Sequence, residues 1–161
     1  MPTKPQLFLD LDGVLGDTAT HYQNRFGVPL TWTDADFVNL KKDSTFYRDQ
    51  PLMPDAIRFW YSCLKYHPNP IILTGIPWSI PSARQQKEEW VWGHFGYSAR
   101  VICCRSVDKF KYGIPGDVLV DDRIKYRQHW LKMGGIFILH TSADDSLSQL
   151  DRLYRQVQPA R

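Results

Sequence analysis

The sequence predicts an α/β protein with a parallel sheet, and three observations lead to this prediction. Five short apolar runs recur along the chain and are continuous rather than alternating, which is typical of strands that are buried on both faces. Segments with helical spacing of apolar residues separate these runs. The 161 residues are 43% hydrophobic, and no linker, repeat or low-complexity tract divides them, so we expect a single domain over residues 1–161.

The five apolar runs are the expected strands. Because strands that alternate with helices are joined by crossover connections, these strands should lie parallel in one sheet. They cover residues 7–11, 71–73, 101–104, 118–120 and 136–139.

Helical patterns occupy the intervals between these strands. Apolar residues recur at helical spacing over residues 57–64. Ser82 with Gln85 has the pattern of a capping box, which predicts the start of a second helix. Ser146 with Gln149 repeats that pattern and predicts the start of the last helix.

The interval between Asp12 and Thr74 is longer than one crossover helix needs, so part of it should form a lid. A helix is expected over residues 18–26, and Thr33 has the character of an N-cap for another. We therefore expect a minimal helical cap at about residues 17–53.

Polar groups lie at the ends of three of the expected strands. The carboxyl ends of parallel strands lie at one edge of a sheet, where ligands bind, so these groups should converge. They are Asp10, Asp12 and Gly13 at the end of the first strand, Thr74 and Gly75 at the end of the second, and Asp121, Asp122 and Arg123 at the end of the fourth.

Four carboxylates packed together repel one another unless a cation is present. Mg²⁺ prefers oxygen ligands and is commonly shared between protein carboxylates and a substrate phosphate. Thr74 and Lys109 are the expected donors to such a phosphate. The sequence therefore predicts a magnesium and phosphate site at this edge of the sheet.

These residues resemble the motifs of the haloacid dehalogenase (HAD) superfamily of phosphatases and phosphotransferases. FLDLDGVLGD is similar to its first motif, ILTG to its second, the region of Lys109 to its third and VLVDDR to its fourth. Within the superfamily, the chain is most similar over nearly its whole length to the type C 5'-nucleotidases, which include the 5'(3')-deoxyribonucleotidases. The resemblance implies a Rossmann-like three-layer α/β/α fold with a small helical cap inserted after the first strand.

The resemblance also implies a role for each acid. Asp10 would be the nucleophile that forms an aspartyl-phosphate, and Asp12 the general acid and base. Mg²⁺ would be held by the Asp10 carboxylate, the Asp12 backbone carbonyl and the acids of the fourth motif. Of these, Asp122 is expected to be the closer ligand, and Asp121 to bind through water or to orient the lysine.

Three further positions would bind the phosphate. Thr74 and the backbone of Gly75 would hold its non-bridging oxygens. Two lysines precede the fourth strand, and the sequence around Lys109 favours it as the motif lysine, with Lys111 as a solvated neighbour.

The implied function is a Mg²⁺-dependent phosphomonoester hydrolase, a 5'-nucleotidase acting on nucleoside or deoxynucleoside monophosphates. One alternative is a 3'-phosphatase of nucleic-acid ends, because residues 121–135 are also similar to the phosphatase domain of polynucleotide kinase-phosphatases. Another is a non-catalytic phosphate-binding module, because a fold does not fix a function.

Aromatic residues of the expected cap have two interpretations: they could stack on a base or pack the cap onto the body. These residues are Trp32, Phe37, Phe46 and Tyr47. Thr18 stands where the related nucleotidases have an aromatic residue, so the resemblance does not support a base preference.

Two more side chains are expected near the mouth of the site. Trp78 lies on the loop after Thr74 and Gly75, which should face the substrate. Arg123 directly follows the two acids of the fourth motif and is expected to form an ion pair.

Composition excludes some classes of protein. The formal charge of +3 does not by itself indicate nucleic acid as a partner. No apolar run is long enough to span a membrane, and the first residues do not have the pattern of a secretory signal. The three cysteines, Cys63, Cys103 and Cys104, are not spaced as zinc ligands and should be free thiols. We expect a soluble, cytoplasmic protein whose partner is a small phosphorylated molecule.

Overall fold

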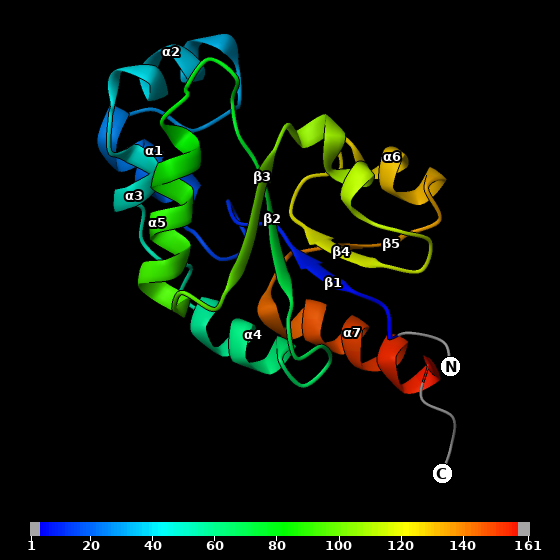
Figure 1. Ribbon diagram of the computed structural model, residues 1–161. Coiled ribbons are helices and arrows are strands. Elements are labelled where there is room, and N and C mark those ends of the chain that lie inside the picture. Colours follow the sequence, from blue (N-terminus) through cyan, green and yellow to red (C-terminus); the bar gives the residue numbers. More distant parts are fainter. Residues whose placement is uncertain (1–3, 158–161) are drawn as a thin grey trace.

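The computed structural model describes residues 4–157, and it confirms the prediction of an α/β protein with a parallel sheet (Figure 1). All five strands are parallel and are arranged in the order β3-β2-β1-β4-β5. Their bounds are Leu7–Leu9 for β1, Ile71–Gly75 for β2, Arg100–Cys104 for β3, Val118–Asp121 for β4 and Ile136–Leu139 for β5.

The first strand, β1, is the centre of the sheet. Phe8 is in register with Ile71 of β2 on one side and with Leu119 of β4 on the other. The chain builds outward from β1 in one direction and then in the other, so the order of strands reverses beside β1. Crevices at such a reversal, beyond the carboxyl ends of the strands, are the usual ligand sites of open α/β sheets.

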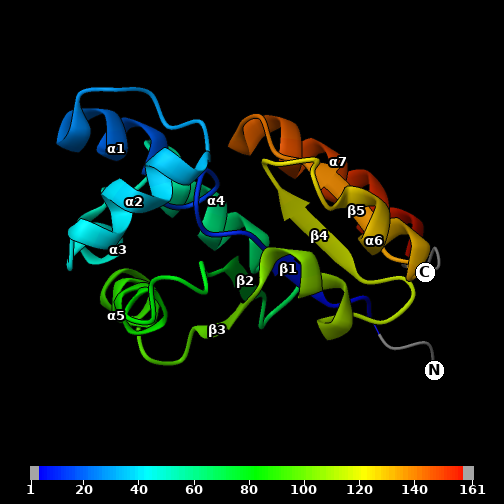
Figure 2. The ribbon, with the colours of Figure 1, turned by 90° about the horizontal axis from the view of Figure 1, so that it is seen from above.

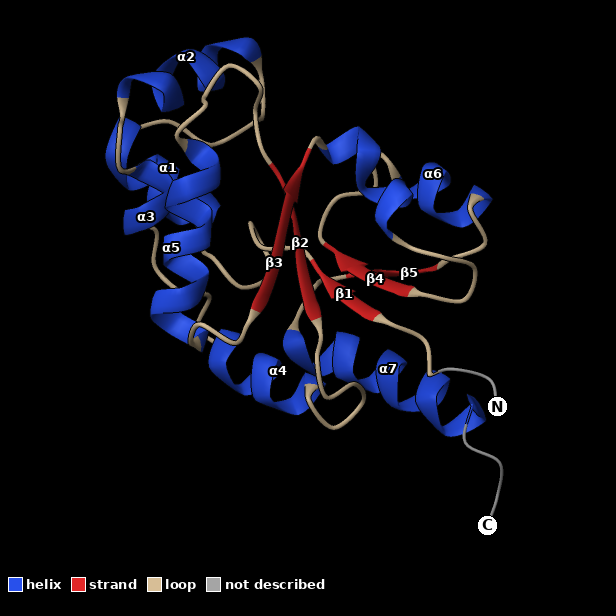
Figure 3. Ribbon diagram, in the orientation of Figure 1, coloured by secondary structure: helices blue, strands red, loops and turns tan. Residues whose placement is uncertain are grey.

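Helices cover both faces of the sheet, and alternate residues of each strand supply the two cores (Figure 3). Leu7 and Leu9 point to the face covered by α4 (Ala56–Cys63), α5 (Ala83–Phe95) and α7 (Ala143–Val157). Phe8 points to the opposite face, which is covered by the 3₁₀ helix η1 (Ser106–Tyr112) and by α6 (Arg127–Lys132).

The helix expected to start at Ser82 does so, because α5 begins at Ala83 with Ser82 as its N-cap residue, whereas the last helix starts at a different position from the expected one. Ser82 is already helical at φ −70° and ψ −14°, and its hydroxyl accepts a hydrogen bond from Gln86 Nε2 rather than capping the helix. The last helix begins at Ala143, three residues before the expected start at Ser146. Its cap is Ser142, whose hydroxyl accepts the Asp145 N–H at 3.1 Å, whereas the hydroxyl of Ser146 lies inside the helix, 2.8 Å from His140 Nδ1.

The segment between β1 and β2 contains a small helical cap to one side of the sheet (Figure 2). It consists of α1 (Thr18–Phe26), α2 (Asp34–Lys42) and α3 (Phe46–Asp49). Its apolar core includes a residue before α5 and the first residue of α5, so the cap packs on the start of that helix. The buried members are Tyr22, Leu40, Phe46, Tyr47, Ile80 and Ala83.

A buried carboxylate, Asp36, organises the cap. It accepts hydrogen bonds from the Tyr22 hydroxyl at 2.7 Å and from the backbone N–H groups of Thr31 and Thr33 at 3.0 and 2.9 Å. Burial alone would raise the pKa of Asp36, but the hydrogen bonds from Thr33, Tyr22 and Thr31 outweigh it and hold the pKa below its ordinary value.

Replacing Asp36 with asparagine should lower the free energy of unfolding by about 1–3 kcal/mol, because buried donors lose a charged acceptor. Because the pKa of Asp36 is lowered in the folded state, its carboxylate contributes to the free energy of unfolding of the wild type. This contribution is complete above about pH 4 and is lost as the pH falls through the folded-state pKa. Urea unfolding between pH 7 and pH 3 should therefore show that the difference in free energy of unfolding between the wild type and the variant becomes smaller as the pH falls. The exposed Asp34, replaced in the same way, is the control, and equal stability of both variants at pH 7 would contradict the assignment.

Two further expectations concern the chain as a whole. All three cysteines are buried and free, as expected. Within residues 4–157, no helix has the length and apolar character needed to cross a membrane.

Candidate active site

Three acids meet where β1 and β4 end. Asp10 directly follows β1, Asp121 is the last residue of β4, and Asp122 follows it. One carboxylate oxygen of each lies within 4.8 Å of the others. The sheet itself creates this cluster, because neighbouring parallel strands bring their final residues to one edge.

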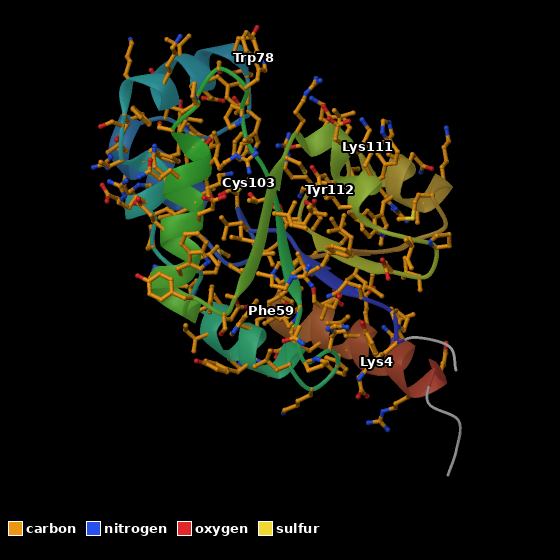
Figure 4. The ribbon with its side chains drawn as sticks, in the orientation of Figure 1. Lys4, Phe59, Trp78, Cys103, Lys111 and Tyr112 are labelled. Atoms are coloured by element: carbon orange, nitrogen blue, oxygen red, sulfur yellow. The ribbon has the colours of Figure 1, made fainter. Side chains whose placement is uncertain are left out.

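Lys109 of η1 bridges two of these acids. Its Nζ lies 2.8 Å from Asp10 Oδ1 and 2.8 Å from Asp121 Oδ2, and its side chain is buried. Lys111 instead pairs with Asp108 and is exposed on the outer side of η1 (Figure 4). The structure therefore brings Lys109, and not Lys111, to the acids.

Gly75 allows η1 to approach the end of β2. A Cβ atom at Gly75 would lie 1.9 Å from the Ser106 hydroxyl and 3.1 Å from Ser106 Cβ at the start of η1, so another residue would force this hydroxyl to rotate and the start of η1 to shift slightly. The position of Lys109, three residues further along η1, depends on this close approach.

The three acids carry more negative charge than Lys109 neutralises. Burial raises the pKa of Asp10 well above its ordinary value, Asp121 raises it further, and Lys109 opposes both effects. Burial and the Asp121 charge also raise the pKa of Asp122 to about 6. Asp122 Oδ1 is buried and has no hydrogen-bond partner among the described residues. A cation would favour the ionised form of all three acids.

The surroundings of Asp122 fit a hard, oxygen-binding cation. Gly13 has φ +82°, and a Cβ there would lie 2.1 Å from Asp122 Oδ2, so the backbone loop packs directly on this carboxylate. Three carboxylates with one unpartnered buried oxygen form a donor set that suits Mg²⁺ or a similar ion. Asp10, Asp121 and Asp122 are the residues that would hold it.

The carboxylate of Asp12 lies apart from this cluster. Asp12 Oδ2 accepts a hydrogen bond from Lys87 Nζ at 2.5 Å, and Oδ1 accepts from the Thr18 hydroxyl and from Gln50 Nε2, each at 3.2 Å. We expected four side-chain carboxylates to converge, and the structure brings together three. The resemblance implies that the backbone carbonyl of Asp12, not its carboxylate, binds the metal. The positions of the side-chain carboxylates do not test that expectation.

Lys87 of α5 is the centre of this second network. Its Nζ also donates to the Gly75 carbonyl at 2.6 Å and to the Thr74 hydroxyl at 3.2 Å, so all three N–H bonds of the ammonium group are used. The ring of Tyr47 lies 4.4 Å from the same nitrogen. Only 1% of the Lys87 side chain is exposed, which makes this a buried ion pair with Asp12.

Thr74 lies at the end of β2, as the sequence predicts, but its hydroxyl contacts Lys87 rather than the cavity. Its side chain is fully buried beneath Lys87, and only its neighbour Gly75 borders the cavity. The hydroxyl expected to bind phosphate is therefore engaged with the lysine in this structure.

The sequence did not lead us to expect Lys87 or Gln50 in the site. Thr18 drew notice only because the related nucleotidases have an aromatic residue at its position. One signal was available for Lys87. It lies four residues after Ala83 and three before Trp90, on the buried face of α5. A lysine at an apolar position of a helix is rarely fully buried unless it is paired.

A cavity of about 260 Å³ opens above these groups. Asp10, Asp12 and Asp121 form its floor together with Lys87 and Lys109. The cap and the loops after the strands form its walls, which include Trp32, Phe37, Tyr47, Trp78, Arg105, Arg123, Lys125, Tyr126 and Arg127.

The four cap aromatics divide between the two interpretations. Phe46 is buried in the cap core, and Tyr47 is buried against Lys87. Trp32 and Phe37 are half-buried and line the cavity. Trp78 lies at the mouth and is 86% exposed (Figure 4).

The expectation of an ion pair for Arg123 is wrong. Within residues 4–157 its guanidinium group forms no ion pair and lies 4.9 Å from the centre of the Trp32 ring. Arg123 thus joins the loop after β4 to the cap by a cation–π contact.

No protein-family model matches the chain, and no curated protein matches it either.

Proposed function

We propose that the protein is a HAD-type, Mg²⁺-dependent phosphomonoester hydrolase that acts through an aspartyl-phosphate. One observation carries the proposal: Asp10 is held by Lys109 within a three-acid cluster, while a second acid, Asp12, is held separately by Lys87 at the same cavity. Two acids in different environments at one site suit the two roles of nucleophile and proton carrier. The similarity to type C 5'-nucleotidases supports a nucleoside or deoxynucleoside monophosphate as substrate.

In the first step, a carboxylate oxygen of Asp10 attacks the phosphorus atom and the ester P–O bond breaks. The leaving alkoxide takes a proton from Asp12, which must therefore be protonated in the enzyme–substrate complex although it is paired with Lys87 in this structure. In the second step, water attacks the aspartyl-phosphate, Asp12 takes back a proton, and phosphate leaves with Asp10 restored. Lys109 fixes the orientation of the Asp10 carboxylate and supplies positive charge to the phosphoryl oxygens. When bound at Asp10, Asp121 and Asp122, Mg²⁺ would offset the negative charge of the phosphoryl group.

A phosphate-release assay over a panel of nucleoside and deoxynucleoside monophosphates tests the proposal. We expect turnover that depends on Mg²⁺ and stops in EDTA. A folded, metal-replete protein that hydrolyses none of the monophosphates would overturn the catalytic assignment. Calorimetry with Mg²⁺ and beryllofluoride would then decide whether the site is a binding module.

Magnesium should also stabilise the fold, because a ligand that binds only the native state adds about 2.7 kcal/mol at one hundred times its dissociation constant. Thermal unfolding with and without Mg²⁺ measures this effect. In the Asp122→Asn variant the effect should be lost, although the variant without metal should be at least as stable as the wild type, because a buried unpaired charge is removed. Asp108→Asn, outside the cluster, should respond to Mg²⁺ like the wild type, and equal responses of all three proteins would exclude Asp122 as a ligand.

A further inference from the structure

Four cationic side chains surround the mouth of the cavity. Arg105 follows β3, whereas Arg123, Lys125 and Arg127 lie on the segment from β4 into α6. Among residues 4–157, none of the four forms an ion pair. We call them the rim cations.

What distinguishes the rim is that four cations unpaired within residues 4–157 border one cavity. Elsewhere on the described surface Arg100 and Arg152 also form no ion pair, and other arginines are paired. Arg48 pairs with Glu89, and Arg58 with Asp144. The described acids that line the cavity are Asp10, Asp12 and Asp121, and these already have Lys87 and Lys109 as partners. The positive charge of the rim is therefore not neutralised by the acids that line the cavity.

The size of the cavity also indicates that a ligand would contact the rim cations. At about 260 Å³, it lies near the lower end of small-molecule pockets, which range from about 300 to 1,000 Å³. A ligand larger than a phosphorylated sugar must extend across the mouth. There it would meet the rim cations and the exposed ring of Trp78.

Arg123 can bind a phosphate group of such a ligand while its guanidinium group remains stacked on Trp32. Its guanidinium group lies over the Trp32 ring, and its N–H groups have no acceptor among the described residues. A planar guanidinium group with free edges binds phosphate oxygens in pairs. The stack therefore orients the side chain without using its donors.

We propose that the rim cations form a second anion subsite, and that the preferred substrate is a nucleotide carrying a further phosphate beyond the one that is hydrolysed. The inference rests on the proposed function, because it assumes that the first phosphate is bound over Asp10. A nucleoside bisphosphate and the phosphorylated end of a short oligonucleotide share this chemistry. The two sources are separated by the arms of the test.

The test compares kcat and KM for a nucleoside 5'-monophosphate, the corresponding 3',5'-bisphosphate, and tetranucleotides phosphorylated at the 5' or the 3' end. A second phosphate should raise kcat/KM about tenfold or more, mainly through KM, since charge-assisted hydrogen bonds are strong. The advantage should shrink between 50 and 200 mM salt. A gain for the bisphosphate identifies the small molecule, and a gain confined to the tetranucleotides identifies the nucleic-acid end.

Variants connect the effect to the rim. Each of three substitutions should reduce the ratio of kcat/KM for the doubly phosphorylated substrate to kcat/KM for the monophosphate: Arg105→Gln, Arg123→Gln and Arg127→Gln. Each should weaken binding of the doubly phosphorylated substrate more than binding of the monophosphate. The control is Arg152→Gln, which removes the same charge from the exposed surface of α7 and should leave the ratio unchanged. Equal kcat/KM for substrates with one and two phosphates, or a ratio insensitive to all three rim substitutions, would overturn the subsite.

Failure of the subsite can be distinguished from failure of the proposed function. Calorimetry on the Asp10→Asn variant compares binding of the monophosphate and the bisphosphate without turnover. Tighter binding of the bisphosphate by this variant, together with a wild-type protein that hydrolyses nothing, would support the subsite and refute the hydrolase. Hydrolysis of monophosphates with no preference for a second phosphate would support the hydrolase and refute the subsite.

Discussion

Replacing Asp10 with asparagine should reduce phosphate release by at least about 10⁴-fold, because an amide cannot form the acyl-phosphate on which both steps depend. The change keeps the shape of the side chain. Lys109 loses a charged partner but keeps the amide oxygen as an acceptor and retains Asp121 at 2.8 Å, so the lysine stays in place. We therefore expect the loss to appear in kcat for every monophosphate.

The same variant should not be less stable than the wild type. Burial and the neighbouring Asp121 already raise the pKa of Asp10, so removal of its charge relieves repulsion within the cluster. Thermal unfolding separates this effect from the loss of catalysis. Asp108→Asn, which affects only the outer pair with Lys111, is the matched control. Retention of a tenth of the activity in Asp10→Asn would refute its role as nucleophile.

Replacing Lys87 with methionine should have the second largest effect, because it leaves the Asp12 carboxylate without its buried partner. Breaking a buried ion pair by removing one member costs about 3–5 kcal/mol, and urea unfolding measures that loss. A displaced proton carrier should lower kcat about 10²-fold, which is within the usual contribution of general acid–base catalysis. Phosphate release under saturating substrate measures the second effect.

A double variant separates the two consequences of the Lys87 change. In Lys87→Met combined with Asp12→Asn, no unpaired charge remains, so most of the lost stability should return. Activity should not return, because the proton carrier is also gone. If the stability losses of the two single variants simply add in the double variant, the ion pair is not the source of the effect.

Strand positions could be predicted from the sequence because each strand is short and buried on both faces. Such strands are continuous apolar runs, and β5 at residues 136–139 matches its run at both ends. The convergence of Asp10 and Asp121 followed from the same pattern, because parallel neighbours end at one edge. The register of Leu9 with Val120 places these two acids side by side.

Side-chain partners inside the site could not be predicted in the same way. Lys87 reaches Asp12 because of the rotation of α5 about its own axis, which apolar spacing fixes only coarsely. Thr74 is expected to bind phosphate because it ends a strand and matches the second motif, but neither the strand pattern nor the motif predicts that its hydroxyl contacts Lys87. Helix starts depend on which of two similar cap patterns is used, as Ser142 and Ser146 illustrate.

The packing of the cap on α5 has a consequence for the kinetics of ligand exchange. The backbone N–H of Tyr47 donates to the side chain of Gln86, and the Trp90 indole donates to the carbonyl of Gln50, so α5 holds the cap at both ends of α3. A cap fixed in this way does not have to open before a ligand enters. We expect association that is linear in ligand concentration, with a rate set by diffusion and by the ionic strength of the solution rather than by a preceding conformational step.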